Sequence, residues 1–451
     1  MKTKRTLWQR VSAMKIILYG YIGIILIGTL LLLLPISTRP GCTTSITDSL
    51  FTATSATCVT GLVRFDTYSH WTTFGQIVIL ILIQIGGLGF MSISLMVLML
   101  ARKKIHLSQR SLMQDSISAP ELGGIVHMVR FILIGTFIIE AAGAILLAFE
   151  FVPSYGISQG IYMSVFHSIS AFCNGGFDVM GKITGECSSM TGYETNVYVN
   201  IVLMLLIVVG GLGFFVWKDI LAKKFSFRKF SLQSKVVVSM SAFLILVGTL
   251  VLVITEYNNP MYDGYSFGSK VLSCCFQSVS ARTAGMNTCD MAQMSEPGVL
   301  MMIFLMLIGG STGSTAGGLK TTTLFVLLLS VRSTFNRRKN IEVFGRRLAP
   351  DLTRTASCIF VTYLTIIFVA TIIISSCDNL PVLTAMFECT SALATVGITL
   401  GVTGSLSMVS KLIIILLMIC GRVGSVTILL AFAPEKTKSA INLPLEKLQI
   451  G

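Results

Sequence analysis

The apolar residues of this chain are gathered into long runs, and short polar segments separate them. Residues 15–35 and 77–101 are typical examples. Each is long enough to cross the hydrocarbon core of a bilayer, which takes about 20 apolar residues. The pattern therefore predicts an all-α polytopic membrane protein. Eight spans are expected, at 15–36, 74–101, 128–152, 197–218, 235–256, 297–331, 355–376 and 410–432.

Each segment between an odd-numbered span and the next contains a second, shorter apolar stretch. About a dozen residues cannot cross a bilayer, but they suit a re-entrant helix that enters and leaves on the same side. Four such helices are expected, in TDSLFTATSA (47–56), GIYMSVFHSISA (160–171), GSKVLSCCFQSVSA (268–281) and LPVLTAMFECTSA (380–392).

The four short stretches share one motif, F-x-x-x-S-A, which begins at Phe51, Phe166, Phe276 and Phe387. A glycine follows each motif within five residues, at Gly61, Gly176, Gly285 and Gly397, and successive glycines lie 115, 109 and 112 residues apart. A near-constant period indicates a repeated structural unit. Four pore repeats are expected at 1–101, 102–218, 219–331 and 332–432, followed by a tail at 433–451. The third repeat has one residue fewer before its glycine.

Four units of span, re-entrant helix, loop and span can surround a single axis. Irregular backbone at membrane depth persists only where it is buried in protein or lines water, and backbone carbonyls from four loops can replace the hydration shell of a cation. Glycine permits a positive φ at no steric cost. The loops TCVTGL (57–62), FCNGGF (172–177), RTAGM (282–286) and LATVGI (393–398) are therefore predicted to ring an ion pathway.

A second motif of small residues recurs in the later span of each repeat, as GGLGF (86–90), GGLGF (210–214), GGSTG (309–313) and GRVG (421–424). Small residues allow helices to approach closely, so packing around the axis is the simplest interpretation of the first two copies. In the third repeat the glycines extend through GGSTGSTAGG (309–318), which cannot hold a regular helix because each glycine costs about 1 kcal/mol. A gate at this point is one hypothesis, and a passive kink is the other.

Two basic residues fall inside spans. Arg422 is costly to bury unless it is paired or functional, and it could donate hydrogen bonds to carbonyls of the 309–318 segment or place positive charge beside the pathway. Lys320 follows that segment directly, as a snorkelling anchor or as part of the gate. Hence the candidate gate comprises Lys320 and Arg422 together with Gly309, Gly310, Ser311, Thr312, Gly313, Ser314, Thr315, Ala316, Gly317 and Gly318.

The distribution of charged residues predicts which side of the membrane each segment faces. The N-terminal segment and the segments near 102–130, 218–235, 332–354 and 433–451 hold 5, 5, 6, 7 and 3 Lys or Arg, which is 26 of the 34 in the chain. The positive-inside rule then places both termini in the cytoplasm. Acidic residues concentrate on the other side, as a cation-attracting vestibule or simply as the complement of that rule: Asp48, Asp66, Glu150, Asp178, Glu186, Glu194, Glu256, Asp263, Asp290, Glu296 and Asp378.

These motifs together resemble those of the Trk/Ktr/HKT superfamily of cation transporters, and the bacterial KtrB-type (TrkH-like) potassium uptake subunits most closely. The resemblance runs from LLLLPIST (31–38) to the C-terminus and is specific in the following segments: ATCVTGLVRFDT (56–67), LIQIGGLGFM (82–91), FHSISAFCNGGF (166–177), ARTAGMN (281–287), GGSTGSTAGGLKTTT (309–323), FECTSALATVGITLG (387–401) and GRVG (421–424).

The resemblance implies a fold and a set of ion-binding residues. Four membrane–pore–membrane units would surround one K⁺ pathway in a bacterial plasma membrane, and a glycine in all four loops is typical of potassium-preferring members, whereas sodium-preferring relatives often carry serine at the position of Gly61. Cys58 stands where many relatives have a hydroxyl residue, which leaves side-chain coordination at the innermost site open. The implied filter residues are Val59, Thr60 and Gly61, Asn174, Gly175 and Gly176, Thr283, Ala284 and Gly285, and Thr395, Val396 and Gly397.

The same resemblance implies partners. It predicts a homodimer on a cytoplasmic RCK-type (KtrA/TrkA-like) regulatory ring, with nucleotide bound by that ring and no cofactor on this chain, whose transported ion is K⁺. It also matches the 309–318 segment to an intramembrane gating loop and Arg422 to a gating arginine. The basic segments on the cytoplasmic side are plausible docking surfaces for the ring.

Three alternatives remain at the level of sequence. A sodium-preferring conductor differs least from the leading hypothesis, whereas a Na⁺- or H⁺-coupled transporter would need an acid on the path, for which only Glu140 and Glu388 are candidates. A membrane enzyme would need clustered His, Cys or Asp/Glu, but the histidines are far apart in the topology and the eleven cysteines show no metal-binding spacing. Pairing among the outer cysteines, Cys42, Cys187, Cys289 and Cys377, is left open.

Overall fold

The computed structural model describes residues 13–89, 125–338, 340–349 and 351–424. Four of its helices are long and apolar enough to cross a bilayer: α1 (Ala13–Leu32), α7 (Ile125–Tyr155), α11 (Leu232–Glu256) and α15 (Asp351–Asp378). They correspond to the first expected span of each repeat. These spans confirm a multi-pass, helical membrane protein.

A short helix follows each long one, as the four apolar stretches predict. These helices are α2 (Ile46–Cys58), α8 (Ile157–Cys173), α12 (Phe267–Ser280) and α16 (Val382–Leu393). Polar caps set where two of them begin: the Ser45 hydroxyl accepts a bond from Asp48 N at 3.2 Å, and the Ser266 hydroxyl accepts one from Ser269 N, also at 3.2 Å. Each short helix packs against the long helix of its own repeat.

The second span of each repeat is not one straight helix. α4 (Thr73–Leu88) ends at Gly89 and α17 (Met408–Val423) at Gly424, both with positive φ. The expected continuous span 197–218 is wrong: α9 (Val197–Leu212) and α10 (Phe214–Ala222) meet at Gly213 with a bend of 96°. α13 (Glu296–Leu307) and α14 (Thr321–Phe335) are separated by an irregular segment. The remainder of the expected spans 74–101 and 410–432, and the tail, lie outside the described residues.

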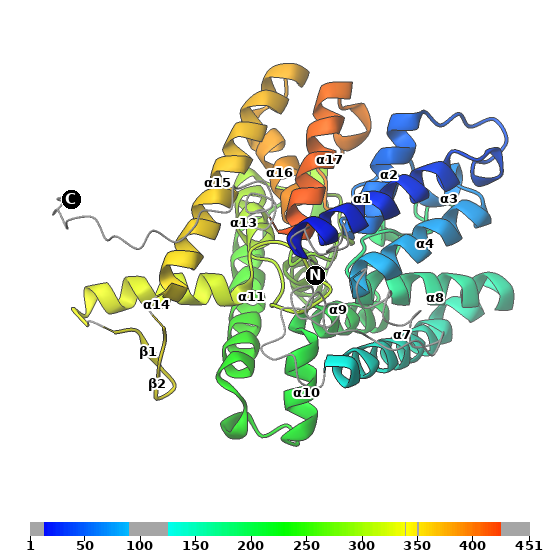
Figure 1. The fold of residues 1–451 in the computed structure, drawn as a ribbon. Coiled ribbons are helices and arrows are strands. Elements are labelled where there is room, and N and C mark those ends of the chain that lie inside the picture. The colour runs from blue at the N-terminus through cyan, green and yellow to red at the C-terminus, as the bar shows by residue number, and fades with distance from the viewer. Residues whose placement is uncertain (1–12, 90–124, 339, 350, 425–451) are drawn as a thin grey trace, which may run out of the picture.

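The four repeats close into a ring. α4 contacts α8 of the next repeat, α9 contacts α12, α13 contacts α16, and α17 returns to α2 of the first repeat. In Figure 1 the blue, cyan, green and orange parts of the chain accordingly follow one another around the centre of the molecule. Every short helix therefore lies between the second span of the preceding repeat and the helices of its own repeat.

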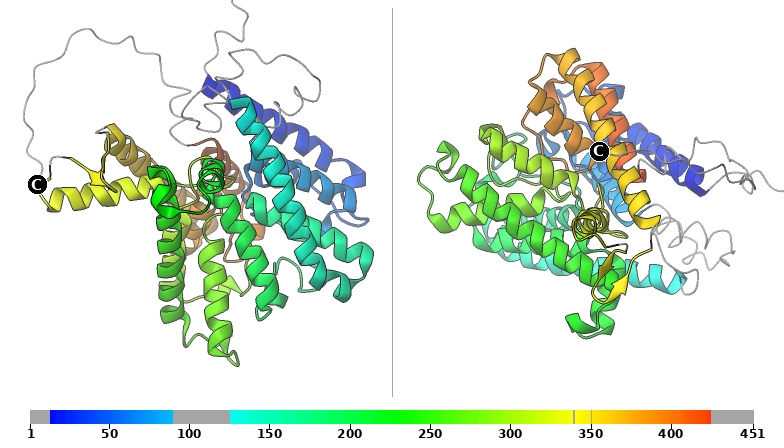
Figure 2. Two further views of the ribbon diagram at one scale, coloured as in Figure 1. Left: turned by 90° about the horizontal axis from the view of Figure 1, so that it is seen from below. Right: turned by 90° about the vertical axis from the view of Figure 1, so that its left-hand side faces the viewer.

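One segment leaves the ring. α14 projects away from the body in Figures 1 and 2, and a two-stranded hairpin of β1 (Glu342–Val343) and β2 (Arg346–Arg347) lies beyond it. The sequence analysis did not predict this hairpin, which is too short to alter the all-α class. The remaining elements are the one-turn helix α3 (Thr67–His70) and 3-10 turns at Pro35–Ser37, Thr191–Tyr193, Phe227–Lys229, Pro260–Tyr262, Met291–Gln293 and Thr403–Ser405.

Candidate functional site

The loops that follow the four short helices meet at the centre of the ring. A Cβ built on Gly61 would lie 2.8 Å from the carbonyl oxygen of Gly175, and one built on Gly285 would lie 2.8 Å from the Cα of Gly176. A Cβ on Gly397 would overlap the carbonyl of Thr60 in the same way. The four repeat glycines therefore adjoin one another, and only glycine fits at these positions. For the role that the sequence predicts for them, we call residues 59–61, 174–176, 283–285 and 395–397 the filter loops.

The filter loops share an alternating backbone conformation. The first residue of each loop has positive φ, at 56° for Val59, 59° for Asn174, 79° for Thr283 and 52° for Thr395. The glycine two positions later also has a positive φ, of 93°, 69°, 81° and 94° in the four loops. Left-handed conformations are rare for β-branched residues, and such strain persists only where the surroundings impose it. The shared pattern also fixes the register of the third loop despite its missing residue.

The serine of each F-x-x-x-S-A motif holds its own filter loop. The amide of the second loop residue donates to the serine carbonyl in all four repeats: Thr60 to Ser55 at 2.8 Å, Gly175 to Ser170 at 2.7 Å, Ala284 to Ser280 at 2.8 Å and Val396 to Ser391 at 2.8 Å. The hydroxyls add a second bond, from Gly61 N to Ser55 and from Gly397 N to Ser391, both at 3.1 Å. Sequence analysis used this serine only as a marker of the repeat and assigned it no role.

Oxygen atoms in and beside the filter loops remain without partners. Among the described residues, the carbonyl oxygens of the first two residues in each loop accept no hydrogen bond. Side-chain oxygens of Thr57, Thr60, Asn174 and Thr395 are buried and also have no hydrogen-bond partner in the described structure. Buried polar atoms nearly always have a partner. A concentration of unpartnered oxygens is the chemical environment that a dehydrated cation requires.

The segment between α13 and α14 docks onto two other repeats. Ser311 N donates to Gly211 O at 3.0 Å, and Phe214 N donates to Gly313 O at 2.8 Å, which joins the segment to the bend between α9 and α10. Thr315 Oγ1 donates to Phe172 O, at the base of α8, at 3.2 Å. A methyl group on Gly318 would lie 3.3 Å from the carbonyl of Ala394. The segment thus lies directly beside the fourth filter loop.

Arg422 connects this segment to the first repeat. From the end of α17 its guanidinium donates to the carbonyl of Thr315 on one side and to the carbonyls of Gly86 and Gly87 on the other, the last at 3.2 Å. The carbonyls at a helix end carry partial negative charge, so α4 supplies part of the compensation for this half-buried cation. Donation to the 309–318 segment is one of the two roles that the sequence left open.

The other residues of the candidate gate bond within the segment. Lys320 Nζ donates to Ala316 O at 2.8 Å, so its ammonium group is turned back toward the segment. The hydroxyls of Ser311 and Thr312 lie 3.2 and 3.3 Å from those of Thr321 and Thr322 at the start of α14, and Ser314 Oγ donates to Ser311 O at 2.7 Å. Gly309, Gly310, Gly317 and Ala316 are buried in it.

The second glycine motif has a specific steric role. A Cβ on Gly86 would overlap the carbonyl of Thr57, one on Gly210 the carbonyl of Phe172, and one on Gly421 the carbonyl of Leu393. Each of these carbonyls lies at or next to the end of a short helix, just before its filter loop. Close packing around the axis, expected from sequence for the first two copies, is confirmed and extends to the fourth. Gly309 differs, because it contacts Gly317 of its own segment.

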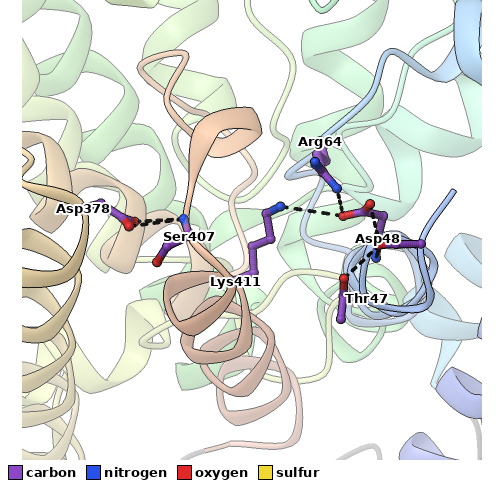
Figure 3. Close-up of polar contacts among 7 residues, drawn as sticks. Thr47, Asp48, Arg64, Asp378, Ser407 and Lys411 are labelled. Atoms are coloured by element: carbon purple, nitrogen blue, oxygen red, sulfur yellow. Dashed lines mark hydrogen bonds and ion pairs between the residues drawn. The ribbon is translucent and has the colours of Figure 1, made fainter. Parts of the chain in front are cut away.

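Charged groups surround the end of the molecule at which the short helices begin. Arg64, three residues after Gly61, pairs with Asp48 of α2, and Lys411 of α17 approaches the same carboxylate at 3.8 Å (Figure 3). Ser407 caps α17 with its side chain, and Asp378 accepts bonds from Ser407 N at 3.2 and 3.3 Å. The contact between Lys411 and Asp48 joins the first and fourth repeats on this side of the filter loops.

Asp178 lies in the loop beyond the second filter loop, two residues after Gly176. Burial and the neighbouring charge of Asp66 raise the pKa of the Asp178 carboxyl to about 7, although a bond from Met180 N opposes the shift. This acid therefore titrates near neutral pH at the mouth of the ring.

The remaining candidate residues from the sequence are packed or hydrogen-bonded inside the protein. Cys58 is buried in an apolar cluster with Leu62 and Leu393, and all eleven cysteines are free thiols. Glu140 accepts a bond from Gln84 at 3.1 Å behind the second filter loop, as expected of a satisfied packing residue. Glu388 is fully buried and accepts bonds from Thr399, Leu400 and Thr403.

Comparison with known proteins agrees with this geometry. The family model described as TrkH, a cation transport protein, matches residues 14–441. The chain belongs to the TrkH family of cation transport proteins. The chain is 39% identical to the potassium/sodium uptake protein NtpJ of Enterococcus hirae, over 99% of both chains, and 38% identical to the Ktr system potassium uptake protein B of Bacillus subtilis, over 98% of both.

The fold is shared more widely within the TrkH family. The crystal structure of the potassium transporter TrkH from Vibrio parahaemolyticus matches with a TM-score of 0.74 at 19% identity, over 96% of this chain and 87% of that one. Membership of a family of cation transporters excludes the membrane-enzyme alternative and supports the Trk/Ktr resemblance.

Proposed function

We propose that this chain is the potassium-translocating subunit of a bacterial K⁺ uptake system, and that ions pass through the ring of filter loops. The observation that carries the proposal is the set of backbone carbonyls in four loops of alternating conformation, directed into a glycine-lined ring and free of hydrogen bonds. Such oxygens can replace the hydration shell of K⁺. Relatives named as potassium uptake proteins cover nearly the whole chain.

The ion-binding atoms would be the carbonyls of the first two residues in each filter loop, with the third residue, glycine, allowing the approach. The set is Val59, Thr60, Gly61, Asn174, Gly175, Gly176, Thr283, Ala284, Gly285, Thr395, Val396 and Gly397. The short helices end at these loops, so the negative ends of their dipoles add to the attraction for a cation. Channel-like conduction requires no further chemistry.

A sodium-permeable pathway is the second candidate, because one relative bears the name potassium/sodium uptake protein. The glycine at all four positions favours potassium. A coupled transporter has less support, since Glu140 and Glu388 are both bound by neighbouring side chains or backbone in the described structure.

Control of conduction would come from the 309–318 segment, held by Arg422 beside the filter loops. The relatives named as proteins of a Ktr system point to a multi-component assembly. The regulatory component would be an RCK-type ring that binds nucleotide and docks on the basic cytoplasmic segments, with the subunit as a homodimer and both termini in the cytoplasm.

Growth of a bacterial strain lacking potassium uptake tests this proposal, at micromolar to low-millimolar K⁺, with and without an RCK partner. Rescue by the wild-type chain and weakened or sodium-permeable rescue by Gly61→Ser are expected, because a serine Cβ would lie against the Gly175 carbonyl. Absence of rescue in every pairing, with the protein confirmed in the membrane, would reject potassium uptake. Unchanged selectivity in Gly61→Ser would reject the filter assignment.

A further inference from the structure

A buried polar residue occupies the same motif position in all four repeats. It follows the motif phenylalanine directly and is Thr52, His167, Gln277 or Glu388. The position lies three residues before the motif serine, so both side chains share one face of the short helix. Since the serine holds the filter loop, this residue faces the irregular segment that leaves the loop.

The side chains at this position contact that segment through different numbers of hydrogen bonds. In the second repeat Val179 N lies 3.5 Å from His167 Nε2, and in the third the Gln277 amide lies 3.2 Å from Cys289 Sγ. Each of these is a single contact, and no bond from Thr52 to its segment is described in the first repeat. There the Asp48–Arg64 ion pair connects the helix to the segment instead.

The fourth repeat has the strongest of these contacts. One oxygen of Glu388 accepts from Thr399 Oγ1 at 2.5 Å and from Leu400 N at 3.1 Å, and the other accepts from Thr403 Oγ1 at 2.8 Å. Three hydrogen bonds to one buried side chain hold the following segment more firmly than the single contacts of the second and third repeats. All three donors lie within six residues of Gly397, in the irregular segment that follows the filter loop, where Thr403 begins a 3-10 turn.

One face of the helix therefore holds both the fourth filter loop and the segment that leaves it. Ser391 binds the loop at Val396 N and Gly397 N, and Glu388 binds the following segment from Thr399 onward. A ring of carbonyls favours K⁺ over the smaller Na⁺ only if its oxygens are kept from closing around the smaller ion, or if their number and field are maintained. Either requirement depends on how the loop ends are held.

We propose that Glu388 is a positioning residue that sets the preference of the pathway for K⁺ over Na⁺ by fixing the outer end of the fourth filter loop. This inference rests on the proposed function. It assigns selectivity to a residue that lies behind the loop and contacts no ion. It also predicts that the four repeats contribute unequally, because a carboxylate occupies this position in the fourth repeat alone.

The test compares Glu388→Gln with Glu256→Gln. Glu256 is a matched control because it is also buried and accepts three bonds, from Asn259 Nδ2, Ser295 N and Ser295 Oγ, but these residues lie at the start of α13 and in a loop away from the filter. Initial Rb⁺ and Na⁺ uptake would be measured in the full chain, normalised to the protein present in the membrane. We expect the Rb⁺/Na⁺ ratio to fall about tenfold in Glu388→Gln and to remain at the wild-type value in Glu256→Gln.

A second variant keeps the test decisive if Glu388→Gln does not reach the membrane. Thr399→Val removes one donor and leaves the carboxylate, so a smaller fall in the ratio, about two- to threefold, is expected. A wild-type ratio in Glu388→Gln, or in Thr399→Val where only that variant is obtained, would overturn the inference. If Gly61→Ser changes the ratio while these variants do not, only the positioning role fails. If none of them changes it, the filter assignment fails as well.

Discussion

The filter loops and the 309–318 segment lie side by side, but they are held in opposite ways. Each filter loop is bound by a serine of its own repeat, and the same bond recurs four times with nearly the same length. The 309–318 segment occurs once and is bound by groups from the second and fourth repeats, and Arg422 links it onward to the first. The filter loops are thus held by local contacts, whereas the segment is held by contacts with other repeats.

On the proposed function, this difference would assign two roles to the ring. A site built from local, repeated contacts keeps its geometry when the helices around it move, which suits ion selection. An element held by distant contacts responds to such movements, which suits control. Four changes would test the comparison, beginning with the largest expected effect.

Gly397→Ala should abolish most of the preference for K⁺. The added methyl overlaps the Thr60 carbonyl and also occupies a φ of +94°, a conformation that costs about 1–3 kcal/mol for other residues. We expect the Rb⁺/Na⁺ uptake ratio to fall at least about tenfold, equivalent to about 1.4 kcal/mol.

Gly41→Ala is the matched control for this change. Gly41 has a similar φ of +88°, but no atom lies within 4 Å of its added methyl. The backbone strain is therefore similar, while the ring is untouched, and the ratio should stay at the wild-type value. Equal losses in both variants would show that backbone strain in general, and not the ring of glycines, controls selectivity.

Arg422→Gln should release the 309–318 segment without altering the preference for K⁺ over Na⁺. It removes charge-assisted bonds to the Thr315, Gly86 and Gly87 carbonyls, and each such bond contributes about 1.5–3 kcal/mol. Rb⁺ uptake in the absence of a regulatory partner is expected to rise about tenfold, with an unchanged Rb⁺/Na⁺ ratio. Arg332→Gln, which removes an exposed cation from α14, serves as the control. A fall in the ratio would mean that Arg422 supports the filter loops themselves.

Thr315→Val should produce a smaller release. Its hydroxyl donates a single neutral bond to the Phe172 carbonyl, which contributes about 0.5–1.5 kcal/mol. Partner-independent uptake should rise about two- to fivefold. Thr334→Val loses a hydroxyl that bonds only within its own helix, to Ser330 O, and should behave as wild type. Equal uptake in the two threonine variants would argue against docking on the second repeat.

Asp178→Asn should give the smallest effect, visible only as a change with pH. Because the pKa of Asp178 is raised to about 7, the carboxylate ionises between external pH 6 and 8 and adds a negative charge near the filter loops. The wild-type KM for K⁺ should fall about twofold over this range, and the variant should show no such change. The same shift lowers the free energy of unfolding as pH rises from about 4 to about 7, since the folded state holds the proton longer.

Much of the architecture was predictable from sequence because it depends on patterns within the chain. Apolar run length predicted the first span of each repeat, the shorter runs identified the re-entrant helices, and the recurrence of F-x-x-x-S-A with its glycine located the four loops that meet at the centre. The serines of that motif gave a signal but no role, because a hydrogen bond between residues four or five positions apart across a helix end requires a conformation that no pattern specifies.

What the sequence determined by itself is the solvent of each segment and the fourfold repetition, since both follow from residue type and spacing. Only the tertiary structure decided how the repeats differ. The bend at Gly213 lies where the 309–318 segment docks. Arg422 donates to carbonyls more than 300 residues away in the chain. Glu388 accepts bonds from three donors in a segment that returns beside its helix. Such contacts join residues whose separation in sequence carries no information about their distance in space.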